Sequence, residues 1–147
     1  MEPKKLPFAE FKKIYRRVPR LCVDLVIKDK RGIVFSKRDI PPAKGQWHLP
    51  GGTVFFGEKL EEAVKRVALD ETSLKVKVQE IFGPIEYSSE SAFGHSISIA
   101  FLVNPIGGKL RGSWQAKEIE FFTKIPENTI AEQKEFLQNY VLKSTRI

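Results

Sequence analysis

The sequence predicts an α/β fold, in which a mixed β-sheet lies between helices as an α/β/α sandwich. Segments with strand-like patterns precede and follow one long amphipathic helical segment, and a second helical segment closes the chain. A chain of 147 residues, 41% of them hydrophobic, is long enough to bury one core. No linker, repeat or low-complexity stretch interrupts it, so we expect a single domain over residues 1–147.

The first half of the chain predicts a short helix followed by a hairpin. Residues 7–16 can form the helix, because Pro7 suits a first helical turn. Residues 21–27 and 33–36 are rich in apolar and β-branched side chains and predict two strands, joined by a turn at 28–32. Prolines and a glycine mark the loop that follows, at Pro41, Pro42 and Gly45.

The second half alternates between helix and strand patterns. Residues 96–103 illustrate the strand pattern, because Ile97, Ile99 and Phe101 fall on one face. The predicted elements are a helix over 58–72 that ends at Ser73, strands over 75–87, 96–103 and 118–122, a glycine-rich loop over 104–113, and a last helix capped by Thr129 and ending near Tyr140.

Composition narrows the class of protein. A single cysteine, Cys22, cannot form an intrachain disulfide, and the chain has neither an apolar leader nor an 18-residue apolar run. We therefore expect a cytoplasmic protein with no membrane contact. The net charge of +7 suits phosphate-rich small molecules as well as RNA. Because the basic residues are spread along the chain, a nucleic-acid partner is not favoured.

The most informative residue is Glu71, which lies in the middle of the apolar face of the long helix. With a step of about 100° per residue, Glu71 falls within about 20° of Leu60. An inward carboxylate must be paired, protonated or bound to a metal. The alternative is a last-turn side chain that bends out to solvent. Gly51 and Gly52 precede the helix and allow positive φ and close approach of carbonyl oxygens, so a site for Mg²⁺ can form here.

The segment 48–74 resembles the Nudix box, G-x5-E-x7-R-E-U-x-E-E-x-G-U, where U is a bulky aliphatic residue. Gly52, Glu58, Arg66, Glu71 and Leu74 fall in register with it. The departures are Asp70 for the first glutamate of the pair, Val67 for the glutamate after the arginine, and Ser73 for the late glycine. The length and fixed spacing of the match identify the chain as similar to the Nudix hydrolases.

Segments outside the box resemble one subgroup, the GDP-mannose mannosyl hydrolases. They lie at residues 8–18, 19–27, 32–38 and 42–47, and the subgroup also lacks the glutamate that Val67 replaces. The resemblance implies one bound Mg²⁺, with Mn²⁺ as a substitute, and cleavage of a nucleoside-diphosphate sugar at the sugar carbon. It also implies a homodimer, in which residues 8–17 pack against the partner.

The resemblance assigns roles to individual residues. Glu71, the Gly51 carbonyl and Gln115 would hold the metal, and Glu58 and Arg66 would form an ion pair that braces the loop against the helix. Three further residues would lie near the substrate's diphosphate and sugar, namely Asp24, Arg38 and His95. Structural alternatives remain open: an Asp24–Arg38 pair, an exposed Arg66–Glu62 pair at i, i+4, and a solvated Gln115.

Two departures from the subgroup bear on activity. Ala116 stands where the subgroup has its general-base histidine, and Thr53 stands where an arginine stabilises the departing diphosphate. A carboxylate, Glu118 or Glu86, could replace the base. The sequence therefore predicts a Mg²⁺-dependent hydrolase of a nucleoside diphosphate linked to another moiety, most simply a sugar. The alternatives are a nucleotide-sugar-binding module without efficient turnover and an RNA 5′-end pyrophosphohydrolase.

Overall fold

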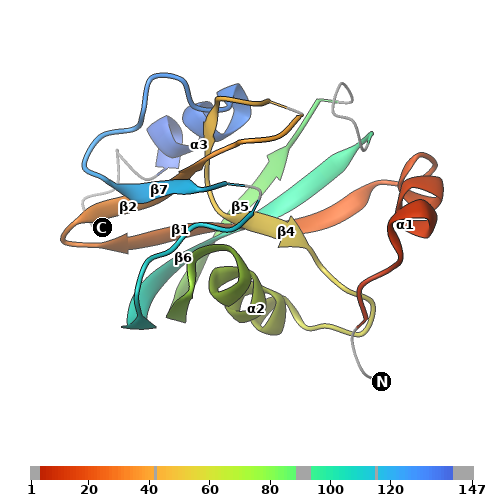
Figure 1. Ribbon diagram of the computed structural model, residues 1–147, viewed down its shortest axis with the longest axis horizontal. Coiled ribbons are helices and arrows are strands. Elements are labelled where there is room, and N and C mark those ends of the chain that lie inside the picture. Colours follow the sequence, from red (N-terminus) through yellow and green to blue (C-terminus); the bar gives the residue numbers. More distant parts are fainter. Residues whose placement is uncertain (1–3, 42, 89–93, 115, 141–147) are drawn as a thin grey trace.

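The computed structural model of the protein describes residues 4–41, 43–88, 94–114 and 116–140. A seven-stranded sheet forms the middle layer, with α2 covering one face and α3 the other. The helix α1 lies at one side of this sandwich (Figure 1). The predicted α/β/α architecture is confirmed. No helix within these described ranges is long and apolar enough to cross a bilayer.

The elements follow one another along the chain in an order that puts the longest helix between two sets of strands. They are α1 (Phe8–Tyr15), β1 (Arg20–Asp29), β2 (Gly32–Lys37), β3 (Trp47–His48), β4 (Gly51–Thr53), α2 (Leu60–Thr72), β5 (Leu74–Glu86), β6 (Ser96–Gly108), β7 (Glu118–Phe122) and α3 (Ala131–Tyr140).

Strand β1 is the centre of the sheet. It pairs in parallel with β6 and antiparallel with β2 and β4, so the sheet is mixed as predicted. On the outer sides, β5 pairs with β6, while β3 and β7 pair with β2. The pairing of β1 with β4 sets Asp24 directly opposite Gly51, which fixes residues 49–52, here called the glycine corner, against the middle of the sheet.

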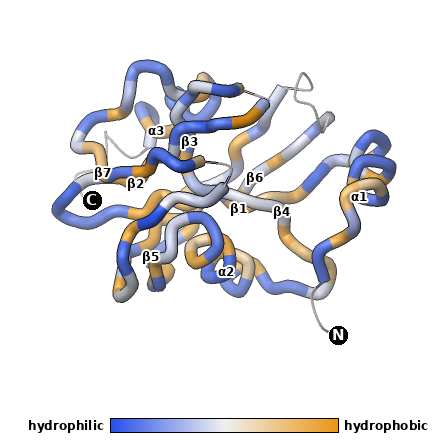
Figure 2. Tube along the Cα trace, in the orientation of Figure 1, coloured by the Kyte–Doolittle hydropathy of each residue, from blue (hydrophilic) through white to orange (hydrophobic). Residues whose placement is uncertain are grey.

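Side chains of β1 alternate between two cores. Val23, Leu25 and Ile27 are fully buried and pack with the apolar face of α2. Val26 points to the other face and packs with Phe136 and Leu137 of α3. Figure 2 shows hydrophobic residues along the strands and on α2, where these cores lie. Burial of large apolar side chains on both faces accounts for the near-continuous apolar run of β1.

Several predicted boundaries were wrong. The loop expected at 104–113 is strand as far as Gly108, because β6 continues its pairing with β5 to the Leu74–Gly108 pair. The predicted cap at Thr129 is also wrong, because its hydroxyl donates to the Pro126 carbonyl and α3 begins only at Ala131. The short strands β3 and β4, of two and three residues, were not predicted, since they are too short to show a period.

The long helix begins at Leu60, two residues later than predicted, and ends as predicted at Ser73. The Glu62 carboxylate accepts a hydrogen bond from the Lys59 backbone N–H, 3.1 Å away, and so satisfies a donor at the helix start. Ser73 has φ of 63°, the left-handed conformation that favours glycine at helix ends. This conformation explains the glycine of the Nudix pattern at this position.

Candidate active site

Close packing requires a glycine at Gly51 and favours one at Gly52, and the expectation of positive φ was wrong. Neither has a positive φ, and both lie in the extended strand β4. A Cβ on Gly51 would overlap the Oδ1 atom of Asp24, and a Cβ on Gly52 would lie 3.1 Å from a methyl group of Val67. Val67, which replaces a glutamate of the Nudix pattern, is thus an apolar contact between α2 and this strand.

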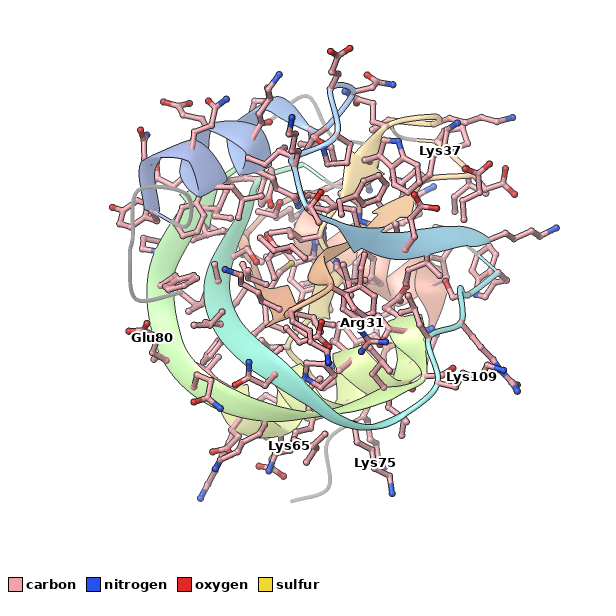
Figure 3. All side chains as sticks on the ribbon, turned by 90° about the vertical axis from the view of Figure 1, so that its left-hand side faces the viewer. Arg31, Lys37, Lys65, Lys75, Glu80 and Lys109 are labelled. Carbon is pink, nitrogen blue, oxygen red and sulfur yellow. The ribbon has the colours of Figure 1, made fainter. Side chains whose placement is uncertain are left out.

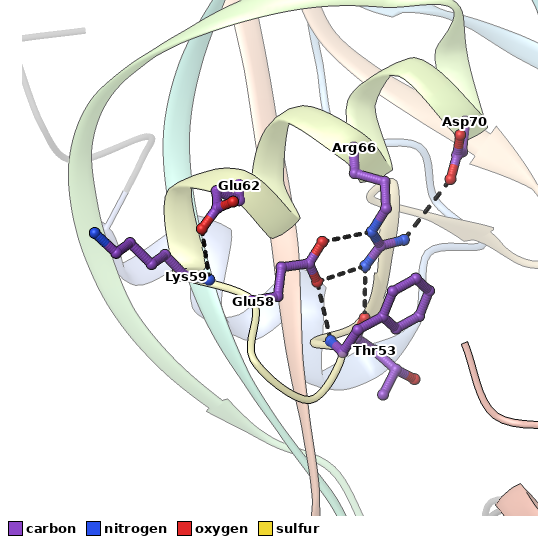
Figure 4. Close-up of polar contacts among 7 residues, drawn as sticks. Thr53, Glu58, Lys59, Glu62, Arg66 and Asp70 are labelled. Atoms are coloured by element: carbon purple, nitrogen blue, oxygen red, sulfur yellow. Dashed lines mark hydrogen bonds and ion pairs between the residues drawn. The ribbon is translucent and has the colours of Figure 1, made fainter. Parts of the chain in front are cut away.

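Arg66 and Glu58 form the predicted brace between the loop and α2 (Figure 4). The Arg66 Nε atom donates to Glu58 Oε2 at 2.7 Å, and Nη2 donates to Glu58 Oε1 at 3.0 Å and to the Thr53 carbonyl at 2.8 Å. Glu58 Oε1 also accepts the Phe55 N–H at 2.9 Å, and the guanidinium lies 3.6 Å from the centre of the Phe55 ring. The exposed Arg66–Glu62 pair was the wrong alternative, because Glu62 bonds Lys59 instead.

The electrostatics of this brace favour charged Glu58. Burial alone would raise the pKa of the Glu58 carboxyl, but the hydrogen bonds from Arg66 and the Phe55 amide hold that pKa below its ordinary value. The side chain of Glu58 is only 4% exposed, so its charge depends on Arg66. The pair ties the end of β4 and the loop after it to the second turn of α2.

Glu71 lies half-buried near the end of α2, as its position on the apolar face predicted. Its Oε2 atom accepts a hydrogen bond from the Ser113 hydroxyl at 3.2 Å. Burial raises the pKa of Glu71, and the neighbouring Asp70 raises it further, while Ser113, Arg38 and Lys5 lower it. Among the described residues Glu71 has no salt-bridge partner. The nearby Arg66 instead approaches the carboxylate of Asp70, at 3.7 Å.

Two cations share the surroundings of Glu71. Arg38 is half-buried, and its Nε and Nη2 atoms donate to the carbonyls of Ile40 and Pro41, each at 3.3 Å. Burial lowers the pKa of Arg38, and the charge of Glu71 partly restores it. Lys5 was missed by the sequence reasoning. It follows Lys4, which forms an isolated bridge with Phe56 in the loop before α2.

Asp24 is buried in a polar chain that reaches α3. The Tyr87 hydroxyl donates to Asp24 Oδ2, and the Gln133 Nε2 atom donates to the Tyr87 oxygen at 2.9 Å. Gln133 Oε1 accepts the Leu49 N–H at 2.7 Å. Burial raises the pKa of Asp24 to about 6, against the opposing hydrogen bond from Tyr87. The alternative of an Asp24–Arg38 pair is wrong, because Asp24 bonds Tyr87 while Arg38 donates to backbone carbonyls of the loop after β2.

The remaining predicted residues are dispersed. His95 is exposed, and its carbonyl accepts the Arg20 N–H at 2.8 Å, while Gln115 lies outside the described residues. Ala116 is buried, and the candidate bases Glu118 and Glu86 are both exposed.

Arg20 was also missed, although it bears on a departure from the mannosyl hydrolases. Its Nη1 atom donates to the Thr53 hydroxyl at 2.8 Å. A guanidinium from the start of β1 therefore reaches the position where that subgroup carries its arginine. The separation of 33 residues between the two partners hid this contact from a reading along the chain.

His48 is a half-buried neutral imidazole beside the glycine corner. Its Nδ1 lies 2.8 Å from the Leu49 carbonyl, and because a carbonyl only accepts, Nδ1 carries the proton. Burial, with a smaller contribution from the charge of Arg38, lowers the pKa of His48 to about 4. Folding therefore shifts the two pKa values in opposite directions. It lowers the pKa of His48 and raises the pKa of Asp24, and in both cases it favours the neutral form.

Between pH 4 and 6, we expect His48 and Asp24 to contribute to the free energy of unfolding with opposite pH dependence. Unfolded His48 binds a proton that the folded form excludes, so its contribution rises with pH, whereas folded Asp24 keeps a proton that the unfolded form loses, so its contribution falls. Each slope approaches about 1.4 kcal/mol per pH unit at most. Relative to the wild type, His48→Asn should lose stability as pH rises and Asp24→Asn should gain it. Urea unfolding at several pH values, with EDTA present, measures both. Parallel curves for the three proteins would contradict this prediction.

The oxygen donors fit a hard divalent cation. Within the described part of the chain, no three His, Cys, Asp or Glu side chains cluster as a metal site. Glu71 offers one half-buried carboxylate with a raised pKa, and β4, which contacts α2, offers the backbone carbonyl of Gly51. Mg²⁺ is commonly held by one or two carboxylates together with substrate phosphates and water. This sparse set therefore suits a cation that binds together with a diphosphate.

Comparison with known proteins agrees with this fold. The NUDIX domain family matches residues 18–140. An ADP-ribose pyrophosphatase from Methanocaldococcus jannaschii is 42% identical over 104 residues, which cover 71% of this chain and 62% of that protein. The low-salt glycan biosynthesis protein Agl8 from Haloferax volcanii is 33% identical over 124 residues, 80% of each chain.

A solved structure shares the fold. The crystal structure of a MutT NUDIX hydrolase from Burkholderia pseudomallei has a TM-score of 0.76 and 21% identity, and the match covers 83% of this chain and 98% of that one. The loop, the braced helix and this sandwich define a hydrolase of the Nudix class. The chain belongs to the NUDIX domain family.

Proposed function

We propose that this protein is a Mg²⁺-dependent hydrolase of nucleoside diphosphates linked to a sugar. The half-buried Glu71 carboxylate, with Arg38 beside it and no ion-pair partner among the described residues, is the observation that carries this proposal. A cation there would compensate the carboxylate, and Arg38 and Lys5 would attract the phosphates. The 42% identical relative is named for ADP-ribose, itself a nucleoside diphosphate linked to a sugar.

The residues of the site have separate tasks. Glu71 and the Gly51 carbonyl would hold the metal, with Gln115 as a further oxygen donor. Arg38 would bind a phosphate through its planar donor fork. Bound Mg²⁺, or Mn²⁺ in its place, would withdraw negative charge from the diphosphate as the bond breaks. The Glu58–Arg66 brace would keep the glycine corner in place.

Attack of water at phosphorus is the reaction we favour. The chain has Ala116 in place of the base of the mannosyl hydrolases, and the relative at 42% identity is named a pyrophosphatase. Water would add to one phosphorus, the bridging P–O bond would break, and the products would be a nucleoside monophosphate and a sugar phosphate. Arg20 at Thr53 would stabilise the charge that develops on the diphosphate.

A substrate panel in ¹⁸O-labelled water tests the function. With Mg²⁺, we expect turnover of ADP-ribose, GDP-mannose or UDP-glucose to give a labelled phosphate product, and EDTA to abolish it. Label in free mannose, with release of GDP, would instead indicate attack at carbon. Binding without any product would support a nucleotide-sugar sensor. Release of a 5′ nucleotide or pyrophosphate from RNA alone would support an RNA 5′-end hydrolase.

We also propose that the protein is cytoplasmic and forms a homodimer through α1. No residue of α1 is buried, and Phe8 is 63% exposed, which supports a partner surface there. Analytical ultracentrifugation measures the assembly directly. A monomer at micromolar concentrations would contradict the dimer.

A further inference from the structure

Three consecutive residues of the glycine corner are held by two different elements, Leu49 by α3 and the next two by β1. The Leu49 N–H donates to Gln133 of α3 at 2.7 Å, and the Pro50 carbonyl accepts the Leu25 N–H at 2.8 Å. Gly51 pairs with Asp24 of β1. The hold on Leu49 is the only one of the three that comes from a helix, and it therefore links the C-terminal helix to the corner.

The same glutamine continues into a chain of hydrogen bonds. Gln133 donates to the Tyr87 oxygen at 2.9 Å, and Tyr87 donates to Asp24 Oδ2. The other carboxylate oxygen, Oδ1, occupies the space where a side chain at Gly51 would begin. Asp24 and Gln133, at the two ends of this chain, are 6% and 3% exposed, and Tyr87 between them is half-buried.

We propose that Gln133 and Tyr87 are positioning residues, which act through Asp24 and Leu49 to fix the Gly51 carbonyl for the metal. This inference rests on the proposed function, in which that carbonyl is a ligand. It also gives Asp24 a different task from the substrate contact that the resemblance implies. A buried carboxylate packed on Gly51 and capped by Tyr87 would orient the backbone of β4.

Hydrogen-bonded partners behind a ligand set its orientation, and their loss typically lowers metal affinity by about 10 to 100-fold. We expect Tyr87→Phe and Gln133→Met each to weaken Mn²⁺ binding about tenfold, measured by electron paramagnetic resonance with saturating α,β-methylene-ADP present. Because Gln133 bonds both Leu49 and Tyr87, the effects overlap, and the double variant should lose at least as much affinity as Gln133→Met but less than the product of the two single losses. At saturating Mg²⁺ the KM for the nucleotide substrate should stay within about twofold of the wild-type value.

Phe136→Leu provides the matched control. Phe136 is a buried residue of α3 that packs in the same core, and it belongs to neither hydrogen-bond chain. It should lower the melting temperature about as much as Gln133→Met while leaving Mn²⁺ affinity unchanged. Equal loss of Mn²⁺ affinity in this control, or wild-type affinity in Tyr87→Phe, would overturn the positioning role and leave the proposed function intact. Failure of the wild type itself to bind Mn²⁺ would overturn the proposed function.

Discussion

Glu71→Gln is expected to lower kcat/KM at least about 10³-fold without destabilising the protein. A metal that withdraws charge from a diphosphate contributes several kcal/mol to the barrier, and each 1.36 kcal/mol is about tenfold in rate. The amide oxygen can still accept the Ser113 hydroxyl, which lies 3.2 Å from the carboxylate. Because burial raises the pKa of Glu71, removing its charge should leave the free energy of unfolding unchanged or increase it.

Glu61→Gln is the control for this substitution, since Glu61 lies on the same helix and its side chain is 63% exposed. It should keep both activity and stability, because its ion pair with Lys65 is on the surface. Steady-state kinetics over a range of Mg²⁺ concentrations and thermal unfolding without metal separate the two properties. Glu71→Gln with more than about a tenth of wild-type kcat/KM would rule out Glu71 as the metal-binding carboxylate.

The part of the site that follows a local period was predictable. Glu71 lies on the apolar face of a 13-residue helix, so its inward direction follows from the helical repeat alone. The Glu58–Arg66 pair spans one loop and two helical turns, and the resemblance to the Nudix box supplied the rest. The two glycines were recognised for the wrong reason, because close contacts with Asp24 and Val67, not φ, favour them.

The parts of the site that depend on the tertiary fold could not be predicted. Tyr87 is 63 residues from its partner Asp24, and Gln133 is 84 residues from Leu49. Nothing in the local sequence distinguishes Tyr87 from any other tyrosine at the end of a strand, or Gln133 from any other glutamine in a helix. Lys5 and Arg20 likewise reach the site only because the N-terminal segment and β1 lie beside the glycine corner. Pairwise packing across the sheet, not sequence spacing, selects these residues.

The basic residues also divide into those that are spread over the surface and those that folding brings to the site. Figure 3 shows Lys37, Lys65, Lys75 and Lys109 pointing away from the body of the protein. These lysines come from several elements, as the spread of basic residues along the chain predicted. The cations beside Glu71, by contrast, are brought together by folding. The overall charge of +7 therefore gives less information on function than the position of a single half-buried arginine, Arg38.

Arg66→Met is expected to lower the free energy of unfolding by about 3 kcal/mol, which corresponds to a melting temperature about 10 °C lower. The variant keeps the apolar stem of the side chain but leaves Glu58, 4% exposed, charged and without its cation. It also removes the hydrogen bond to the Thr53 carbonyl and the contact with the Phe55 ring. Chemical denaturation with urea measures the loss.

Two further variants identify the cause of this loss. Lys65→Met removes an exposed pair with Glu61 on the same helix, so it should cost less than about 0.5 kcal/mol. Adding Glu58→Gln to Arg66→Met should restore about 1 kcal/mol or more, because a neutral amide can still accept the Phe55 N–H without a buried charge. A double variant less stable than Arg66→Met alone would show that the stranded charge is not what destabilises the loop. The stabilising role of the arginine would then lie in its bond to Thr53 and its packing on Phe55.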